Sequence, residues 1–334
     1  MMVTPKDTIA NSLGGLPTRV SVPGGDLDNQ LIWIARNKNQ LRDICLSSGA
    51  VLLEGLVPLS ELGALKVSSK VLDRLMSYTG GDSPRTRLAE GLYTSTDFPP
   101  DFDISLHNEL SHSSNPPAMV LFICVRPPDK GGETMIADSR KILSRLDSTM
   151  VEELDRRGIC YIRNMRGSKG VGRSWQQTFE TADGADVERY CMLSGAGLQW
   201  NADGSARIVQ YGRATAEHPI TKERVWFNQA DMYDPSAQGS EVAEALSELY
   251  GDNMERMPYN VTFGDGGVIP KQVFNVVREA MHAERVLVKW KVGDALLIDN
   301  LLVAHGRTAY KGNRRILVSM SESYIQEASS GSAL

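Results

Sequence analysis

The sequence has few cysteines and no long apolar run. Its four cysteines, Cys45, Cys124, Cys160 and Cys191, are widely spaced without a CxxC pair, which argues against a zinc ribbon or a dense disulfide framework. No apolar run reaches the roughly 18 residues that a membrane-spanning helix needs, and the first residues lack the apolar core of a signal peptide. We therefore expect reduced thiols, no membrane partner and a soluble, cytoplasmic protein.

The sequence also lacks any concentration of charge of one sign. The formal net charge is -5, and both signs are spread along the chain without a basic cluster of the kind that follows a phosphate backbone. Nothing in this pattern indicates nucleic acid as a partner. The length of 334 residues exceeds that of a usual domain. We expect one domain over residues 1–334 with an insertion at about 140–285, and a homo-oligomer stays open.

Histidine is scarce, with five in the chain, and one of them belongs to a distinctive pair. His107 and Glu109 stand one residue apart between apolar neighbours. In a β-strand, residues i and i+2 project from the same face, so we expect both side chains to point into one cavity. One imidazole and one carboxylate make two thirds of a metal site.

A second histidine must come from elsewhere in the chain. His305 ends an apolar run and is the best candidate. His112 is an odd number of residues from His107, so on a strand it would face away, exposed or behind the ligands. His218 and His282 are expected to be structural or solvent-exposed.

The pattern of apolar residues predicts a mainly β protein with flanking helices, an α+β fold. Strands are expected at residues 50–56, 118–125, 286–290, 295–299, 301–305 and 315–320. Helices are expected at residues 39–48, 60–76, 241–250 and 271–282, with a loose alternation at 31–37. Asp138 is a candidate N-cap for a further helix.

Two histidines and one carboxylate on one face of a metal leave three positions open, an arrangement typical of non-haem iron(II) oxygenases. A 2-oxo acid and dioxygen can fill these positions. Decarboxylation of the 2-oxo acid then yields an oxidant that can attack unactivated carbon. The distal carboxylate of that acid needs a cation. Arg315 fits because it lies on the strand after His305, whereas Arg314 is expected to face solvent; Thr134 can add a hydroxyl donor.

These residues resemble the taurine dioxygenase superfamily. The similar elements are the pair at 107 and 109, the segment Gly131-Gly132-Glu133-Thr134, and the C-terminal segment from Asp299 to Arg315. The resemblance implies a double-stranded β-helix (jelly-roll) core, iron(II) bound by His107, Glu109 and His305, and 2-oxoglutarate bound by Thr134 and Arg315.

Two departures from the taurine enzyme affect the expected substrate. Glutamate at position 109, where that enzyme has aspartate, is similar to clavaminate synthase and related amino-acid hydroxylases. Ser319 stands where the taurine enzyme has its sulfonate-binding arginine, which argues against taurine, and a carboxylate at 109 argues against a halogenase. The resemblance favours an amino-acid-like substrate, free or tethered to a carrier protein, in antibiotic or other secondary metabolism. Asn228 and Arg307 are candidate substrate contacts, and orienting neighbouring backbone is an equal alternative for both.

Three functions are compatible with this pattern. Hydroxylation of an sp³ carbon is the first, and desaturation, epoxidation or cyclisation at the same site is the second. The third is a non-catalytic jelly-roll protein that binds a metal or ligand. Thr134 and Arg315 argue against the third, because a structural metal gains nothing from groups that bind a co-substrate.

Overall fold

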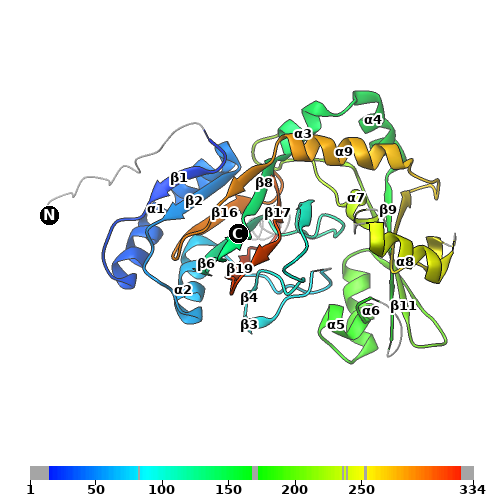
Figure 1. Ribbon diagram of the computed structural model, residues 1–334, viewed down its shortest axis with the longest axis horizontal. Coiled ribbons are helices and arrows are strands. Elements are labelled where there is room, and N and C mark those ends of the chain that lie inside the picture. The colour runs from blue at the N-terminus through cyan, green and yellow to red at the C-terminus, as the bar shows by residue number, and fades with distance from the viewer. Residues whose placement is uncertain are drawn as a thin grey trace, which may run out of the picture.

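Two β-sheets lie at the centre of the computed structural model (Figure 1), which describes residues 15–81, 83–167, 172–234, 237, 240–251 and 254–324. The larger sheet contains, in spatial order, β1 (Thr18–Ser21), β2 (Ala50–Glu54), β16 (Ala295–Asp299), β6 (Met119–Arg126), β19 (Arg315–Met320), β4 (Leu92–Thr94) and β3 (Arg87–Ala89). The smaller sheet contains β15 (Val286–Val288), β8 (Thr134–Asp138), β17 (Val303–Arg307) and β5 (Ile104–His107).

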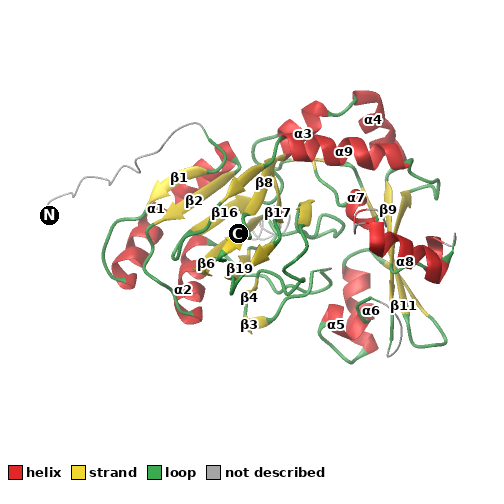
Figure 2. Ribbon diagram, in the orientation of Figure 1, coloured by secondary structure: helices red, strands yellow, loops and turns green. Residues whose placement is uncertain are grey.

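The two sheets share one apolar core. Strands β6 and β16 are buried along nearly their whole length, and their side chains join the same cluster as Ile136 of β8 and Val303 of β17. Continuous apolar runs such as that of β6 are typical of strands covered on both faces. The arrangement confirms the expected α+β class, with sheet at the centre and helices outside (Figure 2).

Two N-terminal helices, α1 (Leu27–Ser48) and α2 (Glu61–Val71), flank the larger sheet at the left of Figure 1. The loose alternation at residues 31–37 was a wrong indication, because these residues belong to α1. The Asp26 side chain accepts a hydrogen bond from the Asn29 backbone N–H, which caps the helix well before the expected start. The helix ends at Gly49, whose φ of 87° favours glycine.

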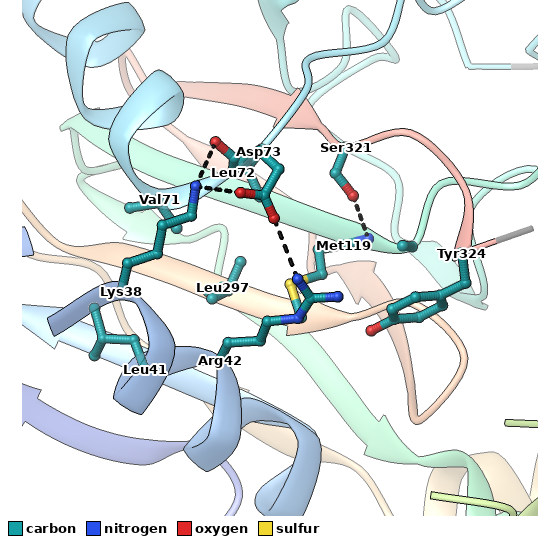
Figure 3. A pocket seen from close by; sticks show the side chains of 11 residues that line it. Lys38, Leu41, Arg42, Val71, Leu72, Asp73, Met119, Leu297, Ser321 and Tyr324 are labelled. Atoms are coloured by element: carbon teal, nitrogen blue, oxygen red, sulfur yellow. Dashed lines mark hydrogen bonds and ion pairs between the residues drawn. The ribbon is translucent and has the colours of Figure 1, made fainter. Parts of the chain in front are cut away.

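A small hollow lies between the ends of these helices and the larger sheet (Figure 3). Asp73, just after α2, accepts from Lys38 Nζ at 2.6 Å and from Arg42 Nη1 at 3.2 Å, both on α1. Leu41 and Leu297 form part of its apolar wall. These ion pairs link α1 to the end of α2 and stabilise the layer of helices.

The segment between β8 and β15 forms a lobe with its own sheet, at the right of Figure 1. Its four strands, in spatial order, are β10 (Gly197–Trp200), β11 (Ala206–Gly212), β9 (Ile159–Met165) and β14 (Tyr259–Phe263). Its helices are α3 (Ser139–Arg145), α4 (Ser148–Arg157), α5 (Trp175–Phe179), α6 (Gly184–Leu193), α7 (Ala230–Tyr233), α8 (Ser240–Tyr250), the 3₁₀ turn η2 (Met254–Arg256) and α9 (Lys271–Ala283). Two short antiparallel pairs complete the structure, β12 (Thr215–Glu217) with β13 (Arg224–Trp226) and β7 (Lys130–Gly131) with β18 (Tyr310–Lys311).

The lobe begins where the sequence indicated a helix start. The Asp138 side chain accepts a hydrogen bond from the Arg140 backbone N–H, which confirms Asp138 as the N-cap of α3.

All four cysteines are free and buried. Among the described residues, no helix is both long and apolar enough to cross a membrane.

Candidate metal centre

His107 is the last residue of β5, and a backbone carbonyl fixes its tautomer. The Nδ1 atom lies 2.9 Å from the Ser105 carbonyl oxygen. Because a carbonyl oxygen only accepts, Nδ1 carries the proton and donates it. The lone pair of Nε2 is therefore left for a metal, the usual arrangement for a ligating histidine.

Glu109 lies next to His107 for a reason that the strand argument did not supply. Strand β5 ends at His107, and Glu109 lies in a turn. The Asn300 side chain accepts from the Glu109 backbone N–H at 2.7 Å and donates to the Glu109 carbonyl oxygen at 2.9 Å. Leu110 then takes a φ of 52°, which turns the chain away. The expectation that His107 and Glu109 share a strand was therefore wrong, and the two hydrogen bonds with Asn300 (the Asn300 clamp) hold Glu109 in place instead.

His305 on β17 completes the group because it stands opposite His107 in the pairing of β17 with β5. Its Nε2 lies 3.5 Å from Glu109 Oε2, and the two imidazole centroids are 4.4 Å apart. One possible ligand atom from each of the three residues lies within 4.8 Å of the other two, and all three residues are buried. Sheet register and the Asn300 clamp together bring three distant ligand types to one point.

The protonation states of these groups suit a metal. Burial raises the pKa of the Glu109 carboxyl, but Arg85 and the two histidines lower it more, so the pKa lies below its usual value. Arg85 Nη2 donates to Glu109 Oε2 at 2.5 Å, with both side chains 3% exposed. Burial, together with His305, lowers the pKa of His107 to about 4. At neutral pH the carboxyl is ionised and His107 is neutral, the forms that ligate metals.

A pocket of about 360 Å³ opens beside these ligands, between the two sheets. Phe122 of β6 and His305 of β17 both line it, with ring centroids 5.1 Å apart. Thr134 of β8 is a further lining residue, and its Oγ1 accepts a hydrogen bond from Trp290 Nε1 at 3.1 Å. Because an indole N–H only donates, the threonine hydroxyl keeps its own proton for another acceptor. Thr134 therefore lies where the sequence placed it, with a donor to offer.

Of the two neighbouring arginines, Arg314 lines this pocket, and the expectation that Arg315 does so was wrong. Arg314 lines the pocket, whereas Arg315 is partly exposed and forms an ion pair with Glu61 of α2. Arg314 lies one residue before β19, where the register with β6 shifts between Arg315 and Ile316, and its side chain faces the pocket while that of Arg315 pairs with α2. With Arg314 in the pocket, the position compared with the sulfonate-binding arginine of the taurine enzyme shifts from Ser319 to Val318. Val318 is also uncharged, so the argument against taurine is unchanged.

Hydrogen bonds hold the Arg314 side chain in place. Its Nε donates to the Gly132 carbonyl oxygen and its Nη1 to Ser95 Oγ, both at 3.1 Å. A Cβ atom on Gly132 would lie 3.1 Å from Arg314 Cδ and 2.9 Å from the Tyr310 Cβ, so glycine leaves room for the arginine. Burial, with a contribution from Arg307, lowers the Arg314 pKa to about 10, which still leaves it charged at neutral pH. Two contacts leave most of its five N–H donors for a ligand.

The two candidate substrate contacts have backbone partners. Asn228 is buried, donates to the Ala214 carbonyl oxygen at 2.8 Å and accepts from the Ala230 N–H at 3.0 Å, so it shapes the chain and is not a pocket residue. Arg307 does line the pocket. Its guanidinium, however, donates to the carbonyl oxygens of Phe98, Pro99 and Phe102 and so fixes that loop.

The remaining histidines do not join the metal ligands. His112 is buried, and its Nδ1 lies 2.9 Å from Gln229 Oε1. His218 is also buried: its Nδ1 accepts from the Thr221 N–H, so its Nε2 is the donor to Asp299 Oδ2 at 3.1 Å. His282 is exposed on α9. The structural assignment of His218 is therefore confirmed.

Comparison with known proteins agrees with this arrangement. Residues 12–321 match the model of a family described as "Taurine catabolism dioxygenase TauD, TfdA family". The chain belongs to the TauD, TfdA family. It is 32% identical over 278 residues to the dapdiamide synthesis protein DdaC of Enterobacter agglomerans, covering 83% of both chains. It is 31% identical over 316 residues to a clavaminate synthase-like protein of Arabidopsis thaliana, covering 91% of both.

The solved structures of this family share the fold. PvcB from Pseudomonas aeruginosa superposes with a TM-score of 0.52 at 14% identity, with 91% of this chain and 85% of PvcB covered. Its structure is described as that of an Fe, α-ketoglutarate dependent oxygenase from an isonitrile synthetic pathway. The two facing sheets are therefore the jelly-roll core that the resemblance implied.

Members of the TauD, TfdA family are dioxygenases that use iron and 2-oxoglutarate, and this chain is such an oxidoreductase. Membership of this family argues against the third function considered above, a non-catalytic protein that binds a metal or ligand. The residues of this chain fit the metal on their own chemistry, since two imidazoles and an ionised carboxylate form the donor set of non-haem iron(II) sites.

We expect the Asn300 clamp to be needed for both folding and metal affinity. Replacing Asn300 by alanine leaves the Glu109 N–H and carbonyl oxygen buried without partners, so the metal-free protein should lose about 2–4 kcal/mol of stability in urea unfolding. Iron(II) affinity should fall about 10- to 100-fold, because the clamp orients a ligand. Asn313→Ala, at an exposed position, is the control. Unfolding of the Asn300 variant within 0.5 kcal/mol of wild type would contradict the clamp.

Proposed function

We propose that this enzyme oxidises an sp³ carbon of a small amino-acid-like substrate, with hydroxylation as the outcome. The observation that carries the proposal is the buried group of His107, Glu109 and His305 beside a pocket that holds Thr134 and Arg314. In this proposal the first three residues hold iron(II), and Thr134 and Arg314 hold the distal carboxylate of 2-oxoglutarate. The amino-acid character of the substrate is supported by Glu109 in place of aspartate and by the likeness to DdaC.

The chain positions and shields the reaction. When bound, iron(II) and 2-oxoglutarate would supply, with dioxygen, the chemistry that oxidises an unactivated carbon. Ser105 holds the His107 proton at Nδ1, and Asn300 holds the backbone of Glu109, so the ligand set is fixed before any ligand enters. Phe122 packs against His305 and excludes water from that side of the site.

Arg314 and Thr134 fix the direction of the co-substrate. A guanidinium grips a carboxylate with charge-assisted hydrogen bonds, and the Thr134 hydroxyl can add one more. Arg314 is itself held by Gly132 and Ser95, so little side-chain freedom is lost when the carboxylate arrives. These contacts leave the space near Ser83 and Thr96 for the substrate.

The four buried free thiols support a reducing compartment, so we propose that the enzyme acts in the cytoplasm, in secondary metabolism. We further propose that its partner is a small molecule, free or carrier-tethered, and that all these residues belong to one domain with an insertion at about 140–285.

The test is succinate formation from 2-oxoglutarate with iron(II), measured for a panel of amino acids and their carrier thioesters. The proposal predicts that at least one of these compounds raises succinate formation and gains the mass of one oxygen atom. A product that has lost two hydrogens would replace hydroxylation by desaturation. A wild-type protein that binds no iron and forms no succinate with any compound would contradict the proposal.

A further inference from the structure

The guanidinium of Arg85 lies in the pocket wall with incomplete hydrogen bonding. Its Nη2 donates to Glu109 Oε2 at 2.5 Å, and its carbon lies 4.3 Å from the centre of the Tyr78 ring. Its Nε and Nη1 are buried and, in the described part of the chain, no acceptor lies in hydrogen-bonding geometry with them, the Tyr78 side chain being the other polar neighbour of the guanidinium. A buried charged donor without an acceptor is costly, more so than a neutral one. Arg85 therefore has charged donors left for an anion.

A count of the charges around the pocket also indicates that Arg85 can bind an anion. In the protein alone, Glu109 balances Arg85. Once iron(II) and 2-oxoglutarate are bound, the metal dication and Arg314 are balanced by Glu109 and the 2-oxoglutarate dianion, so Arg85 loses its counter-charge. Arg307, the third cation of the pocket wall, has Asp103 within electrostatic range and holds three carbonyls. Arg85 is then the cation that needs a further anion, and a monoanion is enough.

We propose that Arg85 binds a carboxylate of the substrate, so that the enzyme takes a free carboxylic acid, such as an amino acid with an unmodified carboxyl group. The inference rests on the proposed function, because Glu109 must be engaged by iron for Arg85 to lack a counter-charge. A charge-assisted bond from a guanidinium is strong and geometrically selective for carboxylates. A thioester on a carrier protein has no such charge, so this site selects against substrates tethered through that carboxyl.

Arg85 has a second possible role that the experiment must separate. By donating to Glu109, it could act as a positioning residue for the metal ligand alone. Loss of that role would weaken metal binding, but it would not change the preference for an acid over its amide. The ratio of these two affinities is thus the measurement that distinguishes substrate binding from positioning.

The experiment uses calorimetry on the full chain, saturated with iron(II) and 2-oxoglutarate without dioxygen. The probes are the common L-amino acids and their primary amides. We expect at least one acid to bind about 10- to 100-fold more tightly than its amide, the range for a hydrogen bond to a charged group. Arg85→Gln should remove that preference, Arg85→Lys should keep part of it, and Arg87→Gln, an exposed arginine on β3, should keep all of it.

Two results would overturn the inference: wild-type protein that binds no acid more tightly than its amide, or an Arg85→Gln variant that keeps the wild-type preference. In both cases iron(II) and 2-oxoglutarate still bind, so the proposed function would stand. Failure of the wild-type protein to bind iron(II) or 2-oxoglutarate would instead remove the proposed function, and this inference with it.

Discussion

Replacing His305 by alanine should reduce 2-oxoglutarate turnover to below about one hundredth of the wild-type rate. A bound metal supplies several kcal/mol of catalysis, and each 1.36 kcal/mol is tenfold in rate. His305 contributes one of three ligands that lie within 4.8 Å of one another, and the described residues offer no other group of this kind. Succinate formation with saturating iron(II) is the measurement, and calorimetry with iron(II) should show the matching loss of metal affinity.

His282→Ala is the matched control, because it removes the same side chain from an exposed position on α9. It should leave succinate formation and iron(II) binding unchanged. Near-normal turnover in the His305 variant, with the control also active, would show that the metal is bound elsewhere.

Replacing Arg314 by alanine should raise the KM for 2-oxoglutarate at least about 30-fold, with a smaller change in kcat. Removing one partner of a buried charge pair costs about 2–5 kcal/mol, and 1.4 kcal/mol is tenfold in affinity. A contact made equally before and during the chemical step affects KM more than kcat. Steady-state kinetics with varied 2-oxoglutarate measures both constants.

Arg315→Ala is the neighbouring control, and it tests the two arginines against each other. Arg315 pairs with Glu61 at the surface, where such ion pairs contribute about 0–1 kcal/mol to stability. Its loss should change the KM for 2-oxoglutarate less than about twofold. A large rise in KM for the Arg315 variant and none for the Arg314 variant would restore the assignment that the sequence suggested.

The sequence was sufficient to find the three candidate ligands, because residue chemistry limits the choice so strongly. With five histidines in the chain, the pair at 107 and 109 and His305, at the end of an apolar run, were the combination that residue chemistry favoured. Most strands of the C-terminal third were also predictable, since β15, β16 and β19 are apolar runs between turn residues.

The choice between Arg314 and Arg315 could not be made from the sequence alone. It depends on how the chain is turned at the start of β19, which is set by the pairing with β6, nearly two hundred residues away, and by the register shift between Arg315 and Ile316. Neighbouring side chains in extended chain point to opposite sides. A choice that is wrong by one position therefore selects an arginine at the surface in place of the one in the pocket.

Asn300 and Arg85 were missed for a related reason. Each acts on Glu109 across a long separation in sequence, and neither carries a local signature. Asn300 follows a buried strand, and nothing near it in the sequence shows that its amide pairs with the Glu109 backbone. A buried arginine has no pattern of its own, so only the three-dimensional arrangement shows that Arg85 faces a carboxylate. For Asn228, the backbone hydrogen bonds decide for the second of its two predicted roles.

A crystal structure of the protein with manganese(II), as a stand-in for iron(II), and 2-oxoglutarate tests the central claim most directly. We predict anomalous density for the metal within coordination distance of His107 Nε2, Glu109 and His305, with the distal carboxylate of 2-oxoglutarate on Arg314 and Thr134. Metal density away from these three side chains, or a carboxylate bound to Arg315, would contradict the account.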